Sequence, residues 1–138
     1  TLLALAYIHH ETLEEGSRLL AAIDARMHEC YCAVFRYENH EFKEVTAPAL
    51  CKPSELLAIA DDNGAEFLCG NAFRIYADEI GDPKKLLSTD DVNAQMIVPL
   101  ARKYFEENKT VDAAEASPLY VRDHVALTIE ERKAEKSR

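Results

Sequence analysis

Two adjacent apolar runs within residues 18–37, RLLAAIDARMHECYCAVFRY, constrain the fold more than any other part of the sequence. The first run covers 19–24, the second covers 29–37, and a short turn joins them. Side chains on both faces of each run are largely apolar, a pattern typical of strands that are covered on both sides. Because the link is short, we expect these strands to form an antiparallel hairpin in the interior of a sheet.

The rest of the chain alternates between helical and extended patterns. A helix is expected at 2–15 and a third strand at about 41–47, after a turn. Beyond them the sequence predicts a helix, a buried strand, two helices and a last strand, at 53–63, 65–70, 71–81, about 90–108 and 117–126. This order predicts an α/β domain with a mixed sheet.

Several residues are expected to define the ends and the shape of the later helices. Asn71 is the expected cap of one helix, and Asp90 or Asp91 the cap of the next. Pro99 lies inside that second helix, which predicts a kink, because an interior proline removes a hydrogen bond. Residues from about 130 to 138 form a mixed-charge tail that we expect to be frayed.

Composition excludes several classes of protein. The chain has 138 residues, 48% of them hydrophobic and 30% charged, which fits one globular domain, and it has no apolar run long enough to span a membrane. The net charge of −9 disfavours direct binding of nucleic acid, because an acidic surface repels phosphates. No signal-peptide pattern opens the chain, so we expect a cytoplasmic location. The first residue is Thr1 rather than methionine, and we expect a piece of a longer protein.

Motifs for catalysis and phosphate binding are absent from the sequence. The four glycines stand alone, so neither of the usual glycine-rich phosphate loops can form. No serine lies in a nucleophile elbow, and no pair of histidines has metalloprotease spacing. The sequence therefore predicts neither catalytic residues nor a bound cofactor.

One arrangement of residues could bind a metal ion. His28, Cys30 and Cys32 alternate and would share one face of an extended strand, with His40 or Cys51 as a further ligand. Zinc sites usually pair ligands across tight knuckles, however, and the chain contains no C-x-x-C. We interpret these cysteines as reduced, mostly buried thiols and predict no metal.

The segment SPLYVRDHVA, residues 117–126, places Arg122 in an apolar run. A guanidinium group there must find a carboxylate or carbonyl groups, because an unpaired buried charge is costly. We expect Arg122 to attach the end of the chain to the sheet, with Asp123 or Asp24 as its partner. The alternative is a surface arginine whose charged end reaches water.

Two motifs carry a resemblance to a known family. LLAAIDARMHECYCAVF and EASPLYVRDHVA resemble the IDAR…E-x-Y hairpin and the closing P-x-Y-x-R segment of the TsaB family, the YeaZ-type proteins of bacterial tRNA modification. GNAF and ENKTVDAAEASP, which lie between them, are also similar to the family. The resemblance covers nearly all of residues 1–138. It extends over only the C-terminal lobe of a two-lobe TsaB, so the glycine-rich loop of the N-terminal lobe has no counterpart in this sequence.

The resemblance implies one lobe of the actin-like ATPase fold, with a ribonuclease-H-like mixed sheet and helices on both sides. It implies a non-catalytic subunit that pairs with TsaD and, with TsaE, makes N6-threonylcarbamoyladenosine in tRNA beside the anticodon. It leaves a homodimer open, and no direct contact of this lobe with nucleic acid is expected. The alternative is a glycoprotease-like or ATPase-like enzyme of the same fold.

Five residues match the motifs of the family, and we expect structural roles for them: Asp24, Arg26, Tyr31, Tyr120 and Arg122. In ATP-binding relatives the corresponding hairpin carries glycines, where the backbone must approach phosphate. Here the turn at 24–28 reads DARMH, and its side chains occupy that space. Asp24 and Arg26 are therefore interpreted as a local charge pair or a partner contact.

Overall fold

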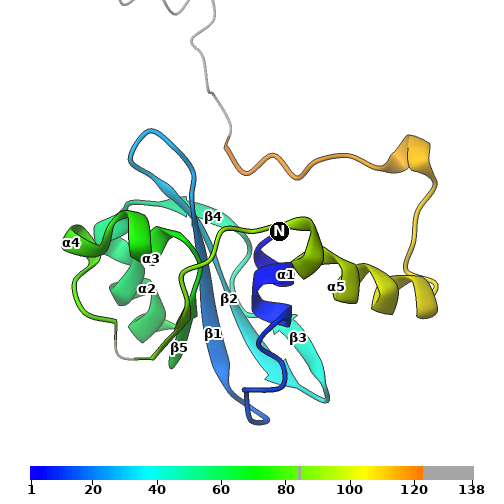
Figure 1. The fold of residues 1–138 in the computed structure, drawn as a ribbon, viewed down its shortest axis with the longest axis horizontal. Helices are drawn as coiled ribbons and strands as arrows, with labels where there is room; N and C mark the ends of the chain where they lie inside the picture. Colours follow the sequence, from blue (N-terminus) through cyan, green and yellow to red (C-terminus); the bar gives the residue numbers. More distant parts are fainter. Residues whose placement is uncertain (84, 123–138) are drawn as a thin grey trace, which may run out of the picture.

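A single mixed sheet forms the centre of the molecule (Figure 1). The computed structural model describes residues 1–83 and 85–122. Within these residues the strand order is β3-β2-β1-β5-β6, and β4 pairs with β2 beside this path. The strands are β1 Arg18–Asp24, β2 Cys30–Glu38, β3 Glu41–Glu44, β4 Ala49–Cys51, β5 Phe67–Cys69 and β6 Leu86–Ser88. The predicted fold class, an α/β lobe with a mixed sheet, is confirmed.

The predicted hairpin is the central element of this sheet. β1 and β2 pair in antiparallel fashion from Arg18 opposite Arg36 to Asp24 opposite Cys30. β5 runs parallel to β1 on its other side, and β6 runs parallel to β5. Both strands of the hairpin thus have a hydrogen-bonded neighbour on each side, which places them in the interior of the sheet.

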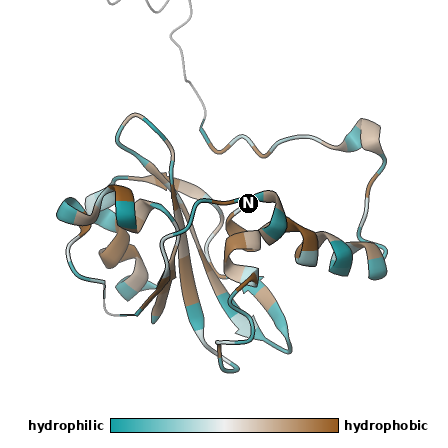
Figure 2. Cartoon of the chain, viewed as in Figure 1, coloured by the Kyte–Doolittle hydropathy of each residue, from teal (hydrophilic) through white to brown (hydrophobic). Residues whose placement is uncertain are grey.

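Helices cover both faces of the sheet (Figure 1). On one face lie η1 Pro53–Glu55, α2 Leu56–Asp62, α3 Ala72–Ile75 and α4 Ala77–Ile80. The other face carries α1 Leu2–Tyr7 and the start of α5 Ala94–Glu106, while the short helix η2 Ala113–Glu115 lies further along the chain. Figure 2 shows hydrophobic residues concentrated along the central strands and in the helices beside them.

Alternate residues of β1 belong to two separate cores. Leu20 packs into the cluster that contains Leu56 of α2, and Leu19 packs into the cluster that contains Leu5 of α1. All four of these side chains are fully buried. The two-residue repeat of a strand therefore distributes the apolar side chains of the hairpin between two layers of helix.

Gly70 is the point of closest approach between β5 and β1. Its φ is +117°, and a Cβ atom built there would lie 1.9 Å from the carbonyl oxygen of Ala22. No side chain fits at that distance, so glycine is required for the chain to leave β5 and enter α3.

The first helix is shorter than predicted, since it ends at Tyr7 and not near residue 15. Turns follow it, and Leu13 remains buried. The Glu15 carboxylate accepts hydrogen bonds from the backbone of Asn39 and His40 in the β2–β3 turn. A helix continued to residue 15 would end with acidic side chains at its negative pole, whereas the turn gives Glu15 donors.

The helix predicted at 71–81 is two short helices that break at Tyr76. Asn71 occupies the predicted N-cap position, but its side chain makes no cap hydrogen bond. Asn93 caps α5, because its Oδ1 accepts from the backbone N–H groups of Gln95 and Met96, and neither Asp90 nor Asp91 does so. The first cap is thus correct in position, and the second lies two residues beyond Asp91.

Other strands differ from prediction at the edges of the sheet. The third strand ends at Glu44, and the three-residue strands β4 and β6 were not predicted. The predicted strand at 117–126 is not seen in its described part, 117–122, and the frayed tail expected at 130–138 lies outside the described residues. Across 1–83 and 85–122, no helix is long and apolar enough to cross a membrane.

Candidate functional site

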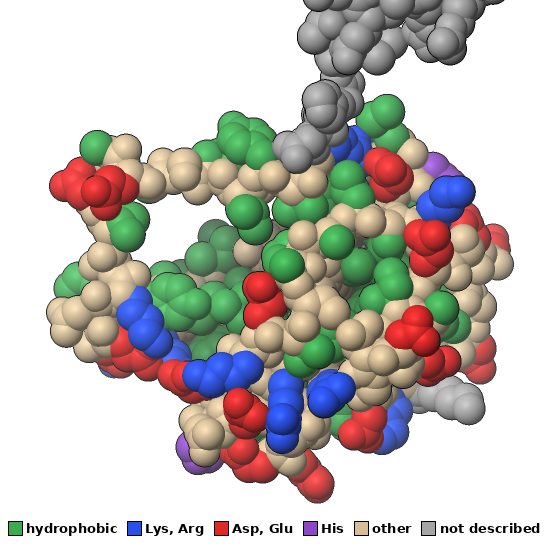
Figure 3. Space-filling view, turned by 180° about the vertical axis from the view of Figure 1, so that it is seen from behind, with side chains coloured by type: hydrophobic (Ala, Val, Ile, Leu, Met, Phe, Trp, Pro, Cys, Tyr) green, Lys and Arg blue, Asp and Glu red, His purple; other side chains and the backbone are tan. Residues whose placement is uncertain are grey.

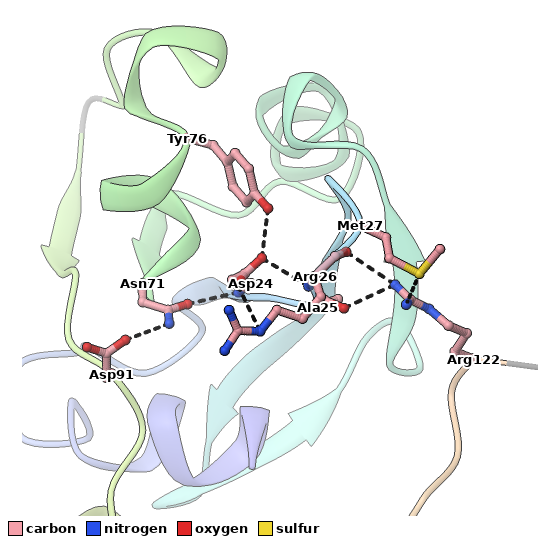
Figure 4. A network of polar contacts seen from close by, with 8 residues as sticks. All are labelled: Asp24, Ala25, Arg26, Met27, Asn71, Tyr76, Asp91 and Arg122. Atoms are coloured by element: carbon pink, nitrogen blue, oxygen red, sulfur yellow. Dashed lines mark hydrogen bonds and ion pairs between the residues drawn. The ribbon is translucent and has the colours of Figure 1, made fainter. Parts of the chain in front are cut away.

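Polar side chains gather where the parallel strands end (Figure 4). Asp24 is the last residue of β1, Asn71 follows β5, and Asp91 follows β6. Because β1, β5 and β6 run parallel, their carboxyl ends meet at one edge of the sheet. In open α/β sheets this edge is the usual place for a functional site.

Hydrogen bonds join these side chains into one network. The backbone N–H of Asp24 donates to Asn71 Oδ1 at 2.9 Å, and Asn71 Nδ2 donates to Asp91 Oδ1 at 2.7 Å. Arg74 Nη2 donates to the other Asp91 oxygen at 2.9 Å. The Tyr76 hydroxyl donates to Asp24 Oδ1 at 2.7 Å. The donors and acceptors at this edge are thus largely bound to one another.

The electrostatics of the pair Asp24–Tyr76 favour a fixed charge over proton transfer. The hydrogen bond from Tyr76 lowers the pKa of Asp24, and the backbone N–H and positive charge of Arg26 lower it further. The same bond raises the pKa of Tyr76 to about 12. Near neutral pH, Asp24 therefore holds its charge and Tyr76 its proton, which is unsuited to a general base or acid.

The turn between β1 and β2 adopts an unusual backbone. Arg26, Met27 and His28 all have positive φ, at 65°, 54° and 60°. Such a conformation costs roughly 1–3 kcal/mol per non-glycine residue and persists only where surrounding contacts enforce it. Backbone hydrogen bonds between Ala25 and Glu29, of 2.8 Å, and between Glu29 and Arg26, of 3.1 Å, close the turn.

Arg122 supplies a further constraint on this turn (Figure 4). Its Nη2 donates to the carbonyl oxygens of Ala25 at 3.1 Å and Arg26 at 3.4 Å, and it forms an ion pair with Glu29. Its Nη1 lies 3.1 Å from Met27 Sδ. The side chain is only 14% exposed, and its Nε is buried without a partner among the described residues.

The contacts of Arg122 correct one part of the sequence prediction. The expected types of partner, a carboxylate and carbonyl groups, are both present. Asp24 is not among them, because its carboxylate is bound to Tyr76 and to the backbone of Arg26. Asp123, the other expected partner, lies outside the described residues.

The remaining motif residues are dispersed. The Arg26 side chain is 89% exposed, with its Nε 3.8 Å from Asp24, so the two form a loose charge pair. Tyr31 is half-buried in β2, and Tyr120 is 77% exposed. Sequence reasoning missed Asn71 as a network residue and did not single out Tyr76; the available signal was their position after a buried strand.

The candidate metal ligands do not come together as a set of three or more. Among residues 1–83 and 85–122, no group of three or more His, Cys, Asp or Glu side chains could hold a metal ion. His28 lies in the turn and contacts Glu79 at 2.7 Å, while Cys30 is buried in the core beside α2. Burial raises the pKa of Cys30 to about 12, which disfavours the thiolate that zinc requires. The absence of a metal stays a prediction.

An apolar groove lies on the α1 face of the sheet, away from this network. It has a volume of about 720 Å³. Figure 3 shows a hollow lined by hydrophobic side chains between the body and the arm formed by residues 107–122. Its walls come from the sheet, from α1, from α5 and from the arm, and they include Leu2, Ile23, Tyr31, Phe35, Phe42, Tyr104, Leu119 and Val121.

The apolar stripe of α5 adds to this surface. The helical spacing of its apolar residues suggests a side that packs on a core, yet no side chain of α5 is buried. Val98 is 62% exposed and Phe105 is 74% exposed. Tyr104 of the same helix lines the groove, and exposed apolar patches are typical of interaction sites.

The fold defines the class of the protein. A meander of antiparallel strands, β3-β2-β1, continues into the parallel strands β5 and β6, with helices on both faces. This is one lobe of the actin-like, ribonuclease-H-like fold, as the resemblance implied.

Comparison with known proteins narrows this class to one family. The TsaB protein of Escherichia coli K12, named as a tRNA threonylcarbamoyladenosine biosynthesis protein, is 32% identical over 116 residues, which are 80% of this chain and 50% of that protein. TsaB of Haemophilus influenzae is 27% identical over 124 residues, 82% of this chain and 51% of the relative. No family model matches the chain.

Solved structures give the same result. A Pseudomonas aeruginosa protein described as similar to the peptidase YeaZ matches with a TM-score of 0.69 and 26% identity, over 88% of this chain and 56% of that one. YeaZ from Pseudomonas aeruginosa matches with a TM-score of 0.67 and 25% identity, over 86% and 56%. The resemblance to the TsaB family is confirmed, and the chain spans about half the length of the curated relatives it matches.

Proposed function

We propose that this chain is the C-terminal lobe of a TsaB-type protein that acts as a non-catalytic assembly subunit. In this proposal its partners are TsaD and TsaE, and the complex makes N6-threonylcarbamoyladenosine in tRNA next to the anticodon. The curated relatives support the proposal, because both bear the name of a tRNA threonylcarbamoyladenosine biosynthesis protein.

One observation carries the non-catalytic role. In the strand-end network, which is the set of polar side chains at the carboxyl ends of β1, β5 and β6, the donors and acceptors are largely bound to one another. The carbonyl groups of the 25–26 turn are bound by Arg122, and the Asp24 carboxylate is bound by Tyr76. The turn at 24–28 contains no glycine, so its side chains occupy the space beside the backbone. Phosphate recognition needs backbone N–H groups at close range. Here Arg122 binds the carbonyl groups of the turn and Tyr76 binds Asp24, which supports a structural role instead.

In the same proposal, the apolar groove on the α1 face is covered by the other lobe of the longer protein. Two observations support this assignment. The relatives are about twice as long as the matched region, and most of the side chains that line the groove are apolar. The exposed side chains of α5, such as Phe105, would extend that contact.

A binding experiment with the full-length protein tests the assembly role. Full-length protein immobilised on a resin should retain its TsaD partner, whereas residues 1–138 alone should retain it weakly or not at all. The family resemblance assigns the TsaD contact to the other lobe, which gives this expectation. Micromolar or tighter binding by residues 1–138 would disprove that assignment. Failure of the full-length protein to bind TsaD would disprove the assembly role itself.

One contact favours testing the enzyme alternative directly. His9 Nε2 lies 2.9 Å from Ser88 Oγ, which is the distance of a nucleophile and its base. Burial lowers the pKa of His9, and among the described residues no carboxylate is bonded to it. We expect no labelling by a serine-directed fluorophosphonate probe. Labelling that disappears in Ser88→Ala would favour a hydrolase.

A further inference from the structure

Two cysteines on neighbouring strands bring their sulfur atoms into contact. Cys32 in β2 and Cys51 in β4 have Sγ atoms 3.5 Å apart. In the antiparallel register, Cys51 lies opposite Cys30 and Ala49 lies opposite Cys32. The contact between Cys32 and Cys51 is therefore diagonal across the β2–β4 pair. Such diagonal neighbours on one face are within reach of each other.

The two thiols differ in exposure and in the direction in which their pKa values shift. Cys32 is 4% exposed, and Cys51 is half-buried. The Cys51 thiol donates its hydrogen bond to Cys32 Sγ. This donation lowers the pKa of Cys32 and raises that of Cys51. By contrast, burial alone raises the pKa of Cys69, whose sulfur lies 3.9 Å from the carbonyl oxygen of Leu5.

We propose that Cys32 and Cys51 form an oxidation site, at which a small peroxide converts the two thiols to an intramolecular disulfide. The Cys32 thiolate attacks one oxygen of hydrogen peroxide, the O–O bond breaks, and Cys32 becomes a sulfenic acid, while the leaving hydroxide takes up the proton that Cys32 released and departs as water. The Cys51 sulfur then attacks the sulfenic sulfur. The S–S bond forms, the S–O bond breaks, and the second water carries away the Cys51 proton. Hydrogen peroxide is reduced, and the two thiols are oxidised.

Forming the bond requires β4 to move toward Cys32, because diagonal neighbours on paired strands lie further apart than directly opposite residues. A disulfide requires the sulfur atoms to approach to about 2.05 Å, and β4 is a three-residue strand outside the main strand path. β4 leads directly into Pro53 at the start of η1. The disulfide would therefore fix to β2 the segment that positions α2. This inference does not depend on the proposed function.

Thiol counting after oxidation tests the proposal. The purified protein is treated with hydrogen peroxide, denatured, alkylated with N-ethylmaleimide and analysed by intact mass spectrometry and peptide mapping. The untreated chain should gain four alkyl groups, one per cysteine, and the oxidised chain two, with a peptide crosslink between Cys32 and Cys51. Treatment with dithiothreitol should restore four.

Two variants sharpen the test. Cys51→Ser should abolish the crosslink and leave a sulfenic acid at Cys32 that dimedone traps. Cys69→Ser is the matched control, because Cys69 packs in the cluster on the opposite face, and it should keep the crosslink. The proposal is wrong if four alkyl groups persist after oxidation, or if the crosslink joins Cys30 to Cys51 or two different chains. The count of alkyl groups and the crosslink map of the wild-type protein test the proposal even if a variant fails to fold.

Discussion

Arg122→Ala should measurably destabilise the protein, because this side chain links the end of the described chain to the β1–β2 turn. The guanidinium group donates to two carbonyl oxygens and pairs with Glu29. A hydrogen bond that involves a charged group contributes about 1.5–3 kcal/mol, and an exposed ion pair about 0–1 kcal/mol. Glu29 is 39% exposed, so solvent screens that pair. We therefore expect a loss of about 2 kcal/mol.

Thermal unfolding followed by circular dichroism measures this loss. For a chain of this length, 1 kcal/mol corresponds to about 4 °C in Tm, so Arg122→Ala should lower Tm by about 8 °C. The Tm of Arg122→Lys should lie between those of the wild type and Arg122→Ala, because lysine keeps the charge but lacks the planar guanidinium group that reaches several acceptors. Arg26→Ala is the matched control, since that arginine lies in the same turn but is exposed, and its Tm should change by less than about 2 °C. A Tm for Arg122→Ala within about 2 °C of the wild type would refute the reasoning and favour a surface arginine.

Four further predictions concern the core, the strand-end network and ligands. Gly70→Ala should prevent folding or lower Tm severely, whereas Gly16→Ala, which meets no atom within 4 Å, should cost only the strain of its positive φ; equal Tm values would contradict this. Tyr76→Phe should lower Tm near neutral pH, and the difference from wild type should shrink as pH falls below about 4, since the lowered pKa of Asp24 stabilises the fold only while the carboxylate is charged; a difference that is independent of pH would point to packing alone. Calorimetry with Mg-ATP should give a dissociation constant no better than about millimolar, and low-micromolar binding that Arg26→Ala abolishes would mean a working nucleotide site. Elemental analysis of protein purified without chelator should find no zinc, and one zinc per chain that is lost with either cysteine of β2 would overturn that prediction.

The sequence predicted the central hairpin correctly because the signal for it is local and strong. Apolar side chains on both faces of 19–24 and 29–37 require cover on both sides, and the short link allows only antiparallel pairing. The helix predicted at 53–63 is also present, as η1 and α2, and a proline at the first position of a helix is a local signal of the same kind. In each case the residues that form the element also carry the pattern that predicts it.

Errors arose where a side chain is used by a distant part of the chain. The helix at 2–15 was predicted too long because Glu15 binds the turn at Asn39, a contact between segments that no local pattern records. The stripe of α5 repeats at helical spacing, but periodicity alone does not say whether another element covers it. The three-residue strands β4 and β6 are too short for any periodic signal.

The strand-end network shows the same limit in the candidate site. Physical reasoning required a carboxylate and carbonyl groups for Arg122, and these are present, but the carboxylate is that of Glu29 and not the expected Asp24. The geometry of the turn explains the difference. Asp24 closes β1 and is turned toward Tyr76, 52 residues away, while Glu29 lies at the other side of the turn, where the arm arrives. Asp24 is thus committed to the α3–α4 side of the sheet edge and Glu29 to the arm. The turn between them, with its three residues of positive φ, therefore lies between two sets of contacts. Contacts on both sides of the turn hold this strained backbone in place.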